Sequence, residues 1–138
     1  MKVLIDTNVI LDFFLLREPH TTNACRLFEM VYKDEIAGFA TANSITDVYY
    51  VTTKKLGENA AREAIRELLK ILGIIAVDGN DCNNALSLPI ADFEDALVTV
   101  CAGKEDTDYI VSNDNEFTQI DSALATVVSL YDFINSQQ

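Results

Sequence analysis

The sequence predicts a three-layer α/β domain in which helices cover both faces of a mostly parallel sheet. The chain of 138 residues is the size of a single domain. Short apolar runs without polar alternation recur along it, which is typical of strands that are covered on both faces. Segments with helical periodicity separate these runs, and strands that alternate with helices favour parallel pairing. We therefore expect one domain over residues 1–138, in the order β-α-α-β-α-α-β-α-α-β-α-β-α.

In chain order, the first expected strand is the apolar run 3–5, and the polar residues that begin at Asp6 then provide an N-cap for a helix. The second strand is 36–40, and a further helix follows it. Residues 59–72 form an amphipathic helix, because their apolar side chains recur on one stripe with charged residues outside it. A glycine ends that helix, and the third strand follows at 74–77.

The second half of the chain continues the alternation. Residues 92–104 form a helix whose apolar stripe begins at Phe93, so this aromatic ring should point towards the sheet. The runs 109–111 and 127–128 supply the fourth and fifth strands. Open parallel sheets bind ligands beyond the carboxyl ends of their strands, so the polar residues that follow each strand are the candidates for a functional site.

Composition excludes several classes of protein. Hydrophobic residues make up 49% and charged residues 23%, which argues against both disorder and membrane insertion. The apolar run that follows Lys2 is too short for a secretory signal. Three widely spaced cysteines and a single histidine, His20, make a zinc site or a disulfide framework improbable, and His20 is expected at a helix start. We expect a reduced, cytoplasmic protein that does not bind membranes.

Charge is distributed unevenly along the chain. The formal net charge is −12, and residues 71–138 contain one basic side chain, Lys104, against twelve acidic ones. A domain that wraps duplex DNA by broad electrostatic attraction would have the opposite sign of charge. The acidic residues therefore form either a solvated surface or, where several converge, a site for divalent cations.

Four aspartates follow different strands and are expected to meet at one edge of the sheet: Asp6, Asp47, Asp95 and Asp114. Each has an ordinary explanation when taken alone, such as capping a helix or complementing its dipole. Asp47 shares a helical stripe with Ser44, Val48 and Val51, so we expect a buried carboxylate that needs a strong partner, rather than one that faces solvent.

Convergent carboxylates repel each other unless a cation compensates their charge. Oxygen ligands without histidine or cysteine favour Mg²⁺ or Mn²⁺, as one or two ions that can activate water and neutralise charge on a phosphodiester. Asp6 and Asp114 would be direct ligands, and Asp95 and Asp47 would complete the coordination. Five neighbouring residues would orient these carboxylates through hydrogen bonds or support the site: Thr7, Asn8, Asp92, Ser112 and Glu116.

Four stretches of the sequence together resemble the PIN domain family: DTNVILD from Asp6, the acid at Asp47, DFEDAL from Asp92, and SNDNEF from Ser112. The resemblance extends from residue 2 to about residue 134. It implies a five-stranded parallel sheet in the order 3-2-1-4-5 and Mg²⁺- or Mn²⁺-dependent cleavage of single-stranded or loop RNA. It also implies that the four aspartates form the catalytic metal site. Small members of this kind are commonly VapC-like toxins, which are usually homodimeric and are paired with an antitoxin protein.

The sequence departs from the family pattern at some positions. The second acid is often Glu, whereas Asp47 is one methylene shorter. The last motif often reads Thr-Arg-Asn/Asp-x-Asp-Phe, whereas this chain has Ser112, Asn113 and Glu116. The loss of the arginine at Asn113 removes a candidate phosphate contact. Phe117 matches the pattern and is expected in the core.

Basic residues that would attract RNA are scarce. Those of the helix after the second strand and of the next helix are candidates for the surface that RNA approaches, with Lys54 and Lys55 foremost: Lys54, Lys55, Arg62, Arg66 and Lys70. The basic residues of the next helix have a simpler explanation, namely local ion pairs between Arg62, Arg66 and Lys70 and the acids Glu58, Glu63 and Glu67.

Two other functions remain open. A PIN-like fold can bind a partner without catalysis, and the presence of Asn113 in place of the family's arginine leaves this alternative open. A phospho-accepting receiver domain is also small and acidic, but it requires a lysine just after a late strand, and Lys104 precedes the fourth strand instead. A phosphatase that uses two aspartates would require an acid at Asn8.

Overall fold

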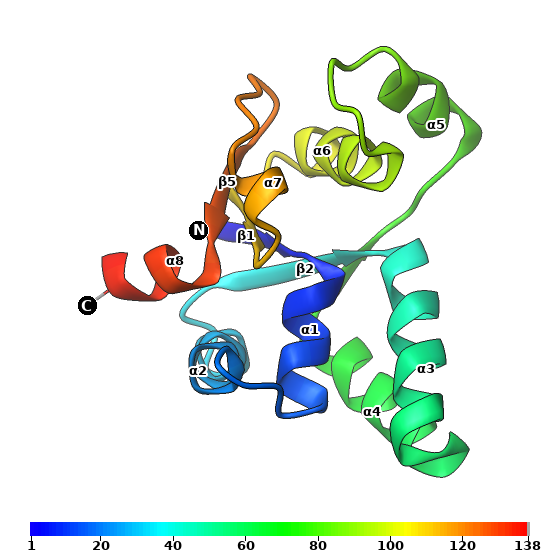
Figure 1. Ribbon diagram of the computed structural model, residues 1–138, viewed down its shortest axis with the longest axis vertical. Helices are drawn as coiled ribbons and strands as arrows, with labels where there is room; N and C mark the ends of the chain where they lie inside the picture. Colours follow the sequence, from blue (N-terminus) through cyan, green and yellow to red (C-terminus); the bar gives the residue numbers. More distant parts are fainter. Residues whose placement is uncertain (138) are drawn as a thin grey trace.

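Five parallel strands form the centre of the molecule in the order β3-β2-β1-β4-β5 (Figure 1). The structure is a computed structural model and describes residues 1–137. The strands are β1 Lys2–Ile5, β2 Ala37–Thr41, β3 Gly73–Ile75, β4 Tyr109–Ser112 and β5 Thr126–Ser129. Both the parallel pairing and the strand order that the sequence led us to expect are confirmed.

Helices connect every pair of consecutive strands, as predicted, and one helix follows the last strand. They are α1 Thr7–Phe14, α2 Thr21–Tyr32, α3 Ala42–Leu56, α4 Glu58–Ile71, α5 Gly79–Leu86, α6 Phe93–Glu105, α7 Asn115–Thr118 and α8 Leu130–Ser136. In Figure 1, α1 to α4 lie on one side of the sheet, and α5 to α7 lie on the other. His20 immediately precedes α2, at the helix start where it was expected.

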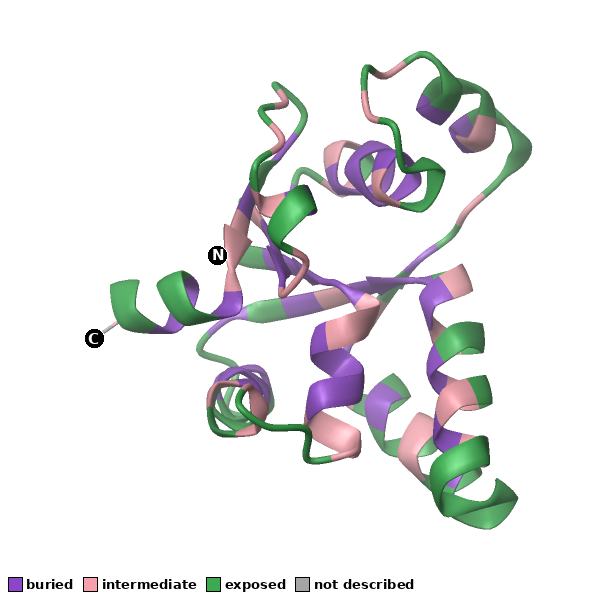
Figure 2. Ribbon diagram, viewed as in Figure 1, coloured by how far each residue is buried: buried purple, intermediate pink, exposed green. Residues whose placement is uncertain are grey.

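The apolar run of the central strand β1 lacks alternation because its side chains are buried on both faces of the sheet. Val3 and Ile5 pack into the core that α1 to α4 cover, whereas Leu4 packs into a second core with Val98 of α6 and Phe117 of α7. Buried residues accordingly lie on both sides of the sheet in Figure 2. Phe117 is fully buried, as expected. Strands that contact helices on both faces need apolar side chains at every position.

The basic residues of α4 are paired locally, which confirms the simpler of the two explanations. Each pairs with an acid three or four residues away at an N–O distance of 2.9–3.2 Å, in the pairs Arg62–Glu58, Arg66–Glu63 and Lys70–Glu67. These pairs are exposed, so solvent screens them and each adds little to the stability of the helix.

Two local predictions were wrong. Phe93 is exposed, because it is the first residue of α6 and the continuously buried part of this helix begins at Ala96. The third strand is Gly73–Ile75 rather than 74–77, because the chain leaves the sheet before Asp78 caps α5. Across residues 1–137, no helix is both long and apolar enough to span a membrane.

Candidate active site

Asp6 lies at the end of the central strand and is held on both carboxylate oxygens. Its Oδ1 accepts a hydrogen bond from the backbone N–H of Thr7 at 2.9 Å, which caps α1. Its Oδ2 accepts one from the hydroxyl of Ser112 at 2.8 Å, because β1 and β4 are neighbours and both end at this edge. Asn8 contributes a longer contact to Oδ2, at 3.4 Å. The carboxylate is therefore fixed in orientation, and its burial raises its pKa above the ordinary value.

The other acids of this edge also begin helices. The side chain of Asp114 caps α7 by accepting from the backbone N–H of Glu116 at 2.9 Å, and its own N–H donates to Ser112 Oγ at 3.0 Å. Ser112 thus connects Asp6 and Asp114. The side chain of Asp92 caps α6 by accepting from the N–H of Asp95 at 3.0 Å. Asp95 contributes only its backbone N–H to this cap, and its side chain makes no hydrogen bond among the described residues.

An open cleft of about 310 Å³ joins these segments. Three of the four predicted aspartates line it, and the full lining is Asp6, Thr7, Asn8, Leu11, Arg17, Asp92, Glu94, Asp95 and Asp114. Ser112 is buried beside the cleft, and Glu116 lines an adjoining cleft together with Asp92 and Asp95. Within residues 1–137, no three acidic, histidine or cysteine side chains are arranged closely enough to form a preformed metal-binding group. The carboxylates therefore surround a space instead of meeting at a point.

The position of Asp47 differs from the prediction. Its side chain is not buried, because the buried face of α3 consists of Ser44, Val48 and Thr52, and Asp47 lies beside that face rather than on it. Asp47 is not among the residues that line the cleft, but its charge helps to raise the pKa of Glu94. Asp47 therefore lies near the cleft and is accessible to solvent, and its role as a metal ligand stays a prediction.

Glu94 is a cleft residue that the sequence analysis did not select. It lies in the first turn of α6 beside Asp95, and burial is the main cause that raises its pKa, followed by the charge of Asp47 and that of Asp6. The density of acids in the first turn was the available signal. Sequence alone did not distinguish an acid that complements the helix dipole from one that points into a cleft.

The electrostatics of the cleft are dominated by repulsion between carboxylates. Burial is the first cause that raises the pKa of Asp95 to about 7, and the negative charges of Asp92, Asp6, Asp114 and Glu94 contribute in that order of importance. Among the described residues, no lysine lines this cleft. A receiver domain needs a lysine beside its phosphorylated aspartate, so the cleft does not match that alternative. An oxygen-only donor set with unbalanced negative charge is chemically suited to Mg²⁺ or Mn²⁺.

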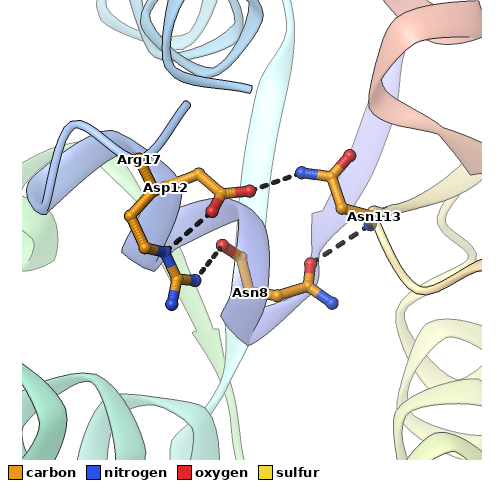
Figure 3. A network of polar contacts seen from close by, with 4 residues as sticks. All are labelled: Asn8, Asp12, Arg17 and Asn113. Atoms are coloured by element: carbon orange, nitrogen blue, oxygen red, sulfur yellow. Dashed lines mark hydrogen bonds and ion pairs between the residues drawn. The ribbon is translucent and has the colours of Figure 1, made fainter. Parts of the chain in front are cut away.

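A second polar network borders the cleft (Figure 3). Asp12 is almost fully buried in α1, and its Oδ1 accepts from Arg17 Nε at 2.9 Å while its Oδ2 accepts from Asn113 Nδ2. The backbone N–H of Asn113 donates to Asn8 Oδ1 at 3.1 Å, and Arg17 Nη2 donates to the carbonyl oxygen of Asn8 at 3.2 Å. Asn113 therefore connects the end of β4 to α1. Asn8 was among the residues that the sequence predicted to support the site, whereas Arg17 was not.

Comparison with known proteins agrees with this architecture. The family model of the PIN domain matches residues 2–116, so the chain belongs to the PIN domain family. A curated relative, Ribonuclease VapC1 of Aquifex aeolicus, is 31% identical over 130 residues, which cover 91% of this chain and 90% of the relative. The chain thus resembles a VapC protein over most of its length.

Solved structures with low sequence identity share the fold. A toxin–antitoxin complex from Klebsiella pneumoniae matches with a TM-score of 0.69 and 18% identity, covering 94% of this chain and 98% of that one. VapC20 from Mycobacterium tuberculosis, described as a toxin that cleaves the sarcin–ricin loop, matches with a TM-score of 0.69 and 13% identity, covering 85% and 93%. VapBC2 from Rickettsia felis, bound to a promoter DNA fragment, matches at 0.67 and 16%, covering 94% and 98%.

Proposed function

We propose that this chain is a metal-dependent endoribonuclease of the VapC toxin type, which hydrolyses phosphodiester bonds in single-stranded or loop RNA. One observation carries the proposal: Asp6, Asp95 and Asp114 come from three distant segments and line one cleft at the carboxyl edge of a parallel sheet. The similarity to a named ribonuclease over nearly the whole chain supports the same activity.

Asp6, Asp95 and Asp114 would hold one or two Mg²⁺ or Mn²⁺ ions, with Glu94 and the more exposed Asp47 as further oxygen donors. The chemistry that such ions supply is the activation of water and the neutralisation of charge at the scissile phosphate. Ser112 fixes the Asp6 carboxylate through its 2.8 Å hydrogen bond, so that this ligand is already oriented.

Thr7 and Asn8 complete the support of the site. The N–H of Thr7 holds the other oxygen of Asp6, and the hydroxyl of Thr7 hydrogen-bonds to that of Ser44 at 2.6 Å, which joins α1 to α3. Asp92 caps α6 and lines the cleft, whereas Glu116, whose backbone N–H donates to Asp114, lines the adjoining cleft; both contribute negative charge. We propose that these residues position the ligands and do not themselves react.

RNA would approach over the end of α3. Lys54 and Lys55 are both exposed in its last turn, and neither forms an ion pair within residues 1–137. The ammonium group of Lys54 lies 4.4 Å from the ring centroid of Tyr50, which adds an aromatic surface to the positive charge. Replacing both lysines with glutamine should weaken RNA binding and flatten its salt dependence. Unchanged affinity and salt dependence would remove this surface from the proposal.

The cellular role that we propose is that of a cytoplasmic toxin that acts as a homodimer and is neutralised by a protein antitoxin. Expression of the wild-type chain should arrest bacterial growth, and co-expression of the neighbouring antitoxin gene should relieve the arrest. Growth that is unaffected by an active nuclease would point to an RNA-processing enzyme instead.

The decisive test is cleavage of a structured RNA pool in the presence of Mg²⁺ or Mn²⁺. Wild type and the matched control Asp121→Asn, which changes an exposed acid outside the cleft, should cleave. Asp6→Ala and Asp95→Asn should lose cleavage, and a chelator should abolish the activity of wild type. Cleavage that survives both cleft substitutions would refute the assignment. RNA binding without cleavage by any form would favour the non-catalytic binding module.

A further inference from the structure

We propose that Arg17 binds a phosphate group of the substrate RNA at the mouth of the acidic cleft. The inference rests on the proposed function, because it assumes that a phosphodiester enters this cleft. It adds a substrate-contacting residue that lies outside the four aspartates and outside the two lysines of α3.

The location of Arg17 is the first support. Arg17 is the one basic residue among the described residues that line the cleft, and it shares this lining with Asp95 and Asp114. The turn after α1 brings it there: Leu16 adopts a left-handed backbone conformation with φ of 52°, and the N–H of Arg17 donates to the carbonyl oxygen of Asp12 at 3.1 Å. This closes α1 in the manner of a Schellman motif and turns the arginine back along the helix.

The bonding of the guanidinium group is the second support. Of its five N–H donors, Nε is bound to Asp12 and one N–H of Nη2 is bound to the carbonyl oxygen of Asn8. The remaining donors have no partner among residues 1–137, and 42% of the side chain is exposed. Figure 3 shows the guanidinium held from one side by these two contacts. An arginine that is fixed in place but retains free donors can bind a phosphate with little further loss of side-chain entropy.

Pairing with Asp12 uses only part of the hydrogen-bonding capacity of Arg17. The second oxygen of Asp12 already accepts a hydrogen bond from Asn113, so the carboxylate needs only one donor from the arginine. The acids of the cleft repel an incoming phosphate, and cations bound by those acids would balance only the centre of the site. Arg17 supplies positive charge at its border, where the phosphates that flank the scissile bond would lie.

Binding of RNA provides a test that does not depend on turnover. The probe is a fluorescein-labelled, single-stranded oligoribonucleotide of mixed sequence with 2′-O-methyl groups, whose integrity is checked on a gel after each anisotropy titration in Mg²⁺. Arg17→Gln should weaken binding about tenfold, because a charged hydrogen bond to phosphate is lost. It should also reduce the slope of log K against log salt by about 0.7, as expected for one lost contact to a single strand. Arg26→Gln is the matched control, since it removes the same charge from an exposed position on α2.

A charge exchange separates phosphate binding from a purely structural role. Arg17 and Asn113 donate to the two oxygens of the same carboxylate, so an arginine at either position can pair with Asp12. Adding Asn113→Arg to Arg17→Gln should restore both the affinity and the salt slope, and, if Arg17→Gln folds poorly, the added pair with Asp12 should restore its melting temperature as well. The proposal is overturned if Arg17→Gln binds RNA with the same affinity and salt slope as Arg26→Gln. It is also overturned if the exchange variant has the melting temperature of wild type but does not recover RNA affinity. If wild type cleaves no RNA in the assay above, the proposed function fails instead.

Discussion

Replacement of Asp95 by asparagine should stabilise the protein in the absence of metal, while it abolishes nuclease activity. The side chain of Asp95 makes no hydrogen bond within the described residues, and the contacts of this residue to Asp92 and Thr99 use its backbone N–H and carbonyl groups. Asparagine has nearly the same shape and is uncharged at every pH. The substitution therefore removes a repelled charge without removing a contact.

The magnitude follows from the electrostatics of the cleft. A folded-state pKa of about 7 against the ordinary value of 3.8 corresponds to at most about 4 kcal/mol between the protonated and ionised forms of Asp95. The side chain is only partly buried, so solvent screening reduces the expected gain in the free energy of unfolding to about 1–2 kcal/mol. For a chain of this length, that gain raises the melting temperature by roughly 4 °C per kcal/mol.

The dependence on pH has a defined sign. Because the pKa of Asp95 is higher in the folded chain than in the unfolded chain, the folded state binds the proton more tightly. Its contribution to stability is fully present below about pH 4 and is lost as the pH rises through about 7. The asparagine side chain does not titrate, so the advantage of Asp95→Asn over wild type should grow from pH 5 to pH 8.

Thermal unfolding of metal-free protein at pH 5 and pH 8, compared with Asp121→Asn, measures this effect. Mg²⁺ at ten times its dissociation constant should stabilise wild type by about 1.4 kcal/mol and should stabilise Asp95→Asn much less. A variant that melts at or below the temperature of wild type at pH 8, with the same dependence on pH, would refute the argument from charge repulsion.

Three predictions concern the fold. Gly38→Ala should lower the free energy of unfolding by about 1–2 kcal/mol in urea titrations, because a Cβ there would lie 2.8 Å from Leu72 Cδ2. Phe117→Ala should cost about 3–5 kcal/mol in the same assay, since the ring is fully buried. Lys104→Met should lower the melting temperature at pH 7, because the 2.7 Å contact with Lys104 holds the pKa of Asp81 below its ordinary value. That loss should shrink below about pH 4, where protonation of Asp81 removes the contribution of the pair in wild type; an equal loss at both pH values would contradict it.

Local chemistry carried most of the information that the sequence alone provided. Uninterrupted apolar runs such as Val3–Ile5 are typical of strands that lie between two layers of helices, where both faces are buried. The alternation of these apolar runs with segments of helical periodicity predicted the order of the helices and strands, and the motifs that end with Phe117 identified the family. Capping residues such as Asp6 and Asp114 marked the ends of strands correctly because a cap depends only on neighbouring backbone groups.

The tertiary structure decided which of the acids point into the cleft. Periodicity placed Asp47 on a stripe with Ser44 and Val48, but the buried face of α3 continues from these two residues to Thr52 and leaves Asp47 exposed beside it. Which side of the helix is covered depends on packing against other helices. Glu94 and Arg17 enter the site because the first turn of α6 and the turn after α1 meet at one edge of the sheet. Sequence determines the period of a helix, whereas the rotation of that helix and the direction of a turn depend on contacts between segments far apart in the chain.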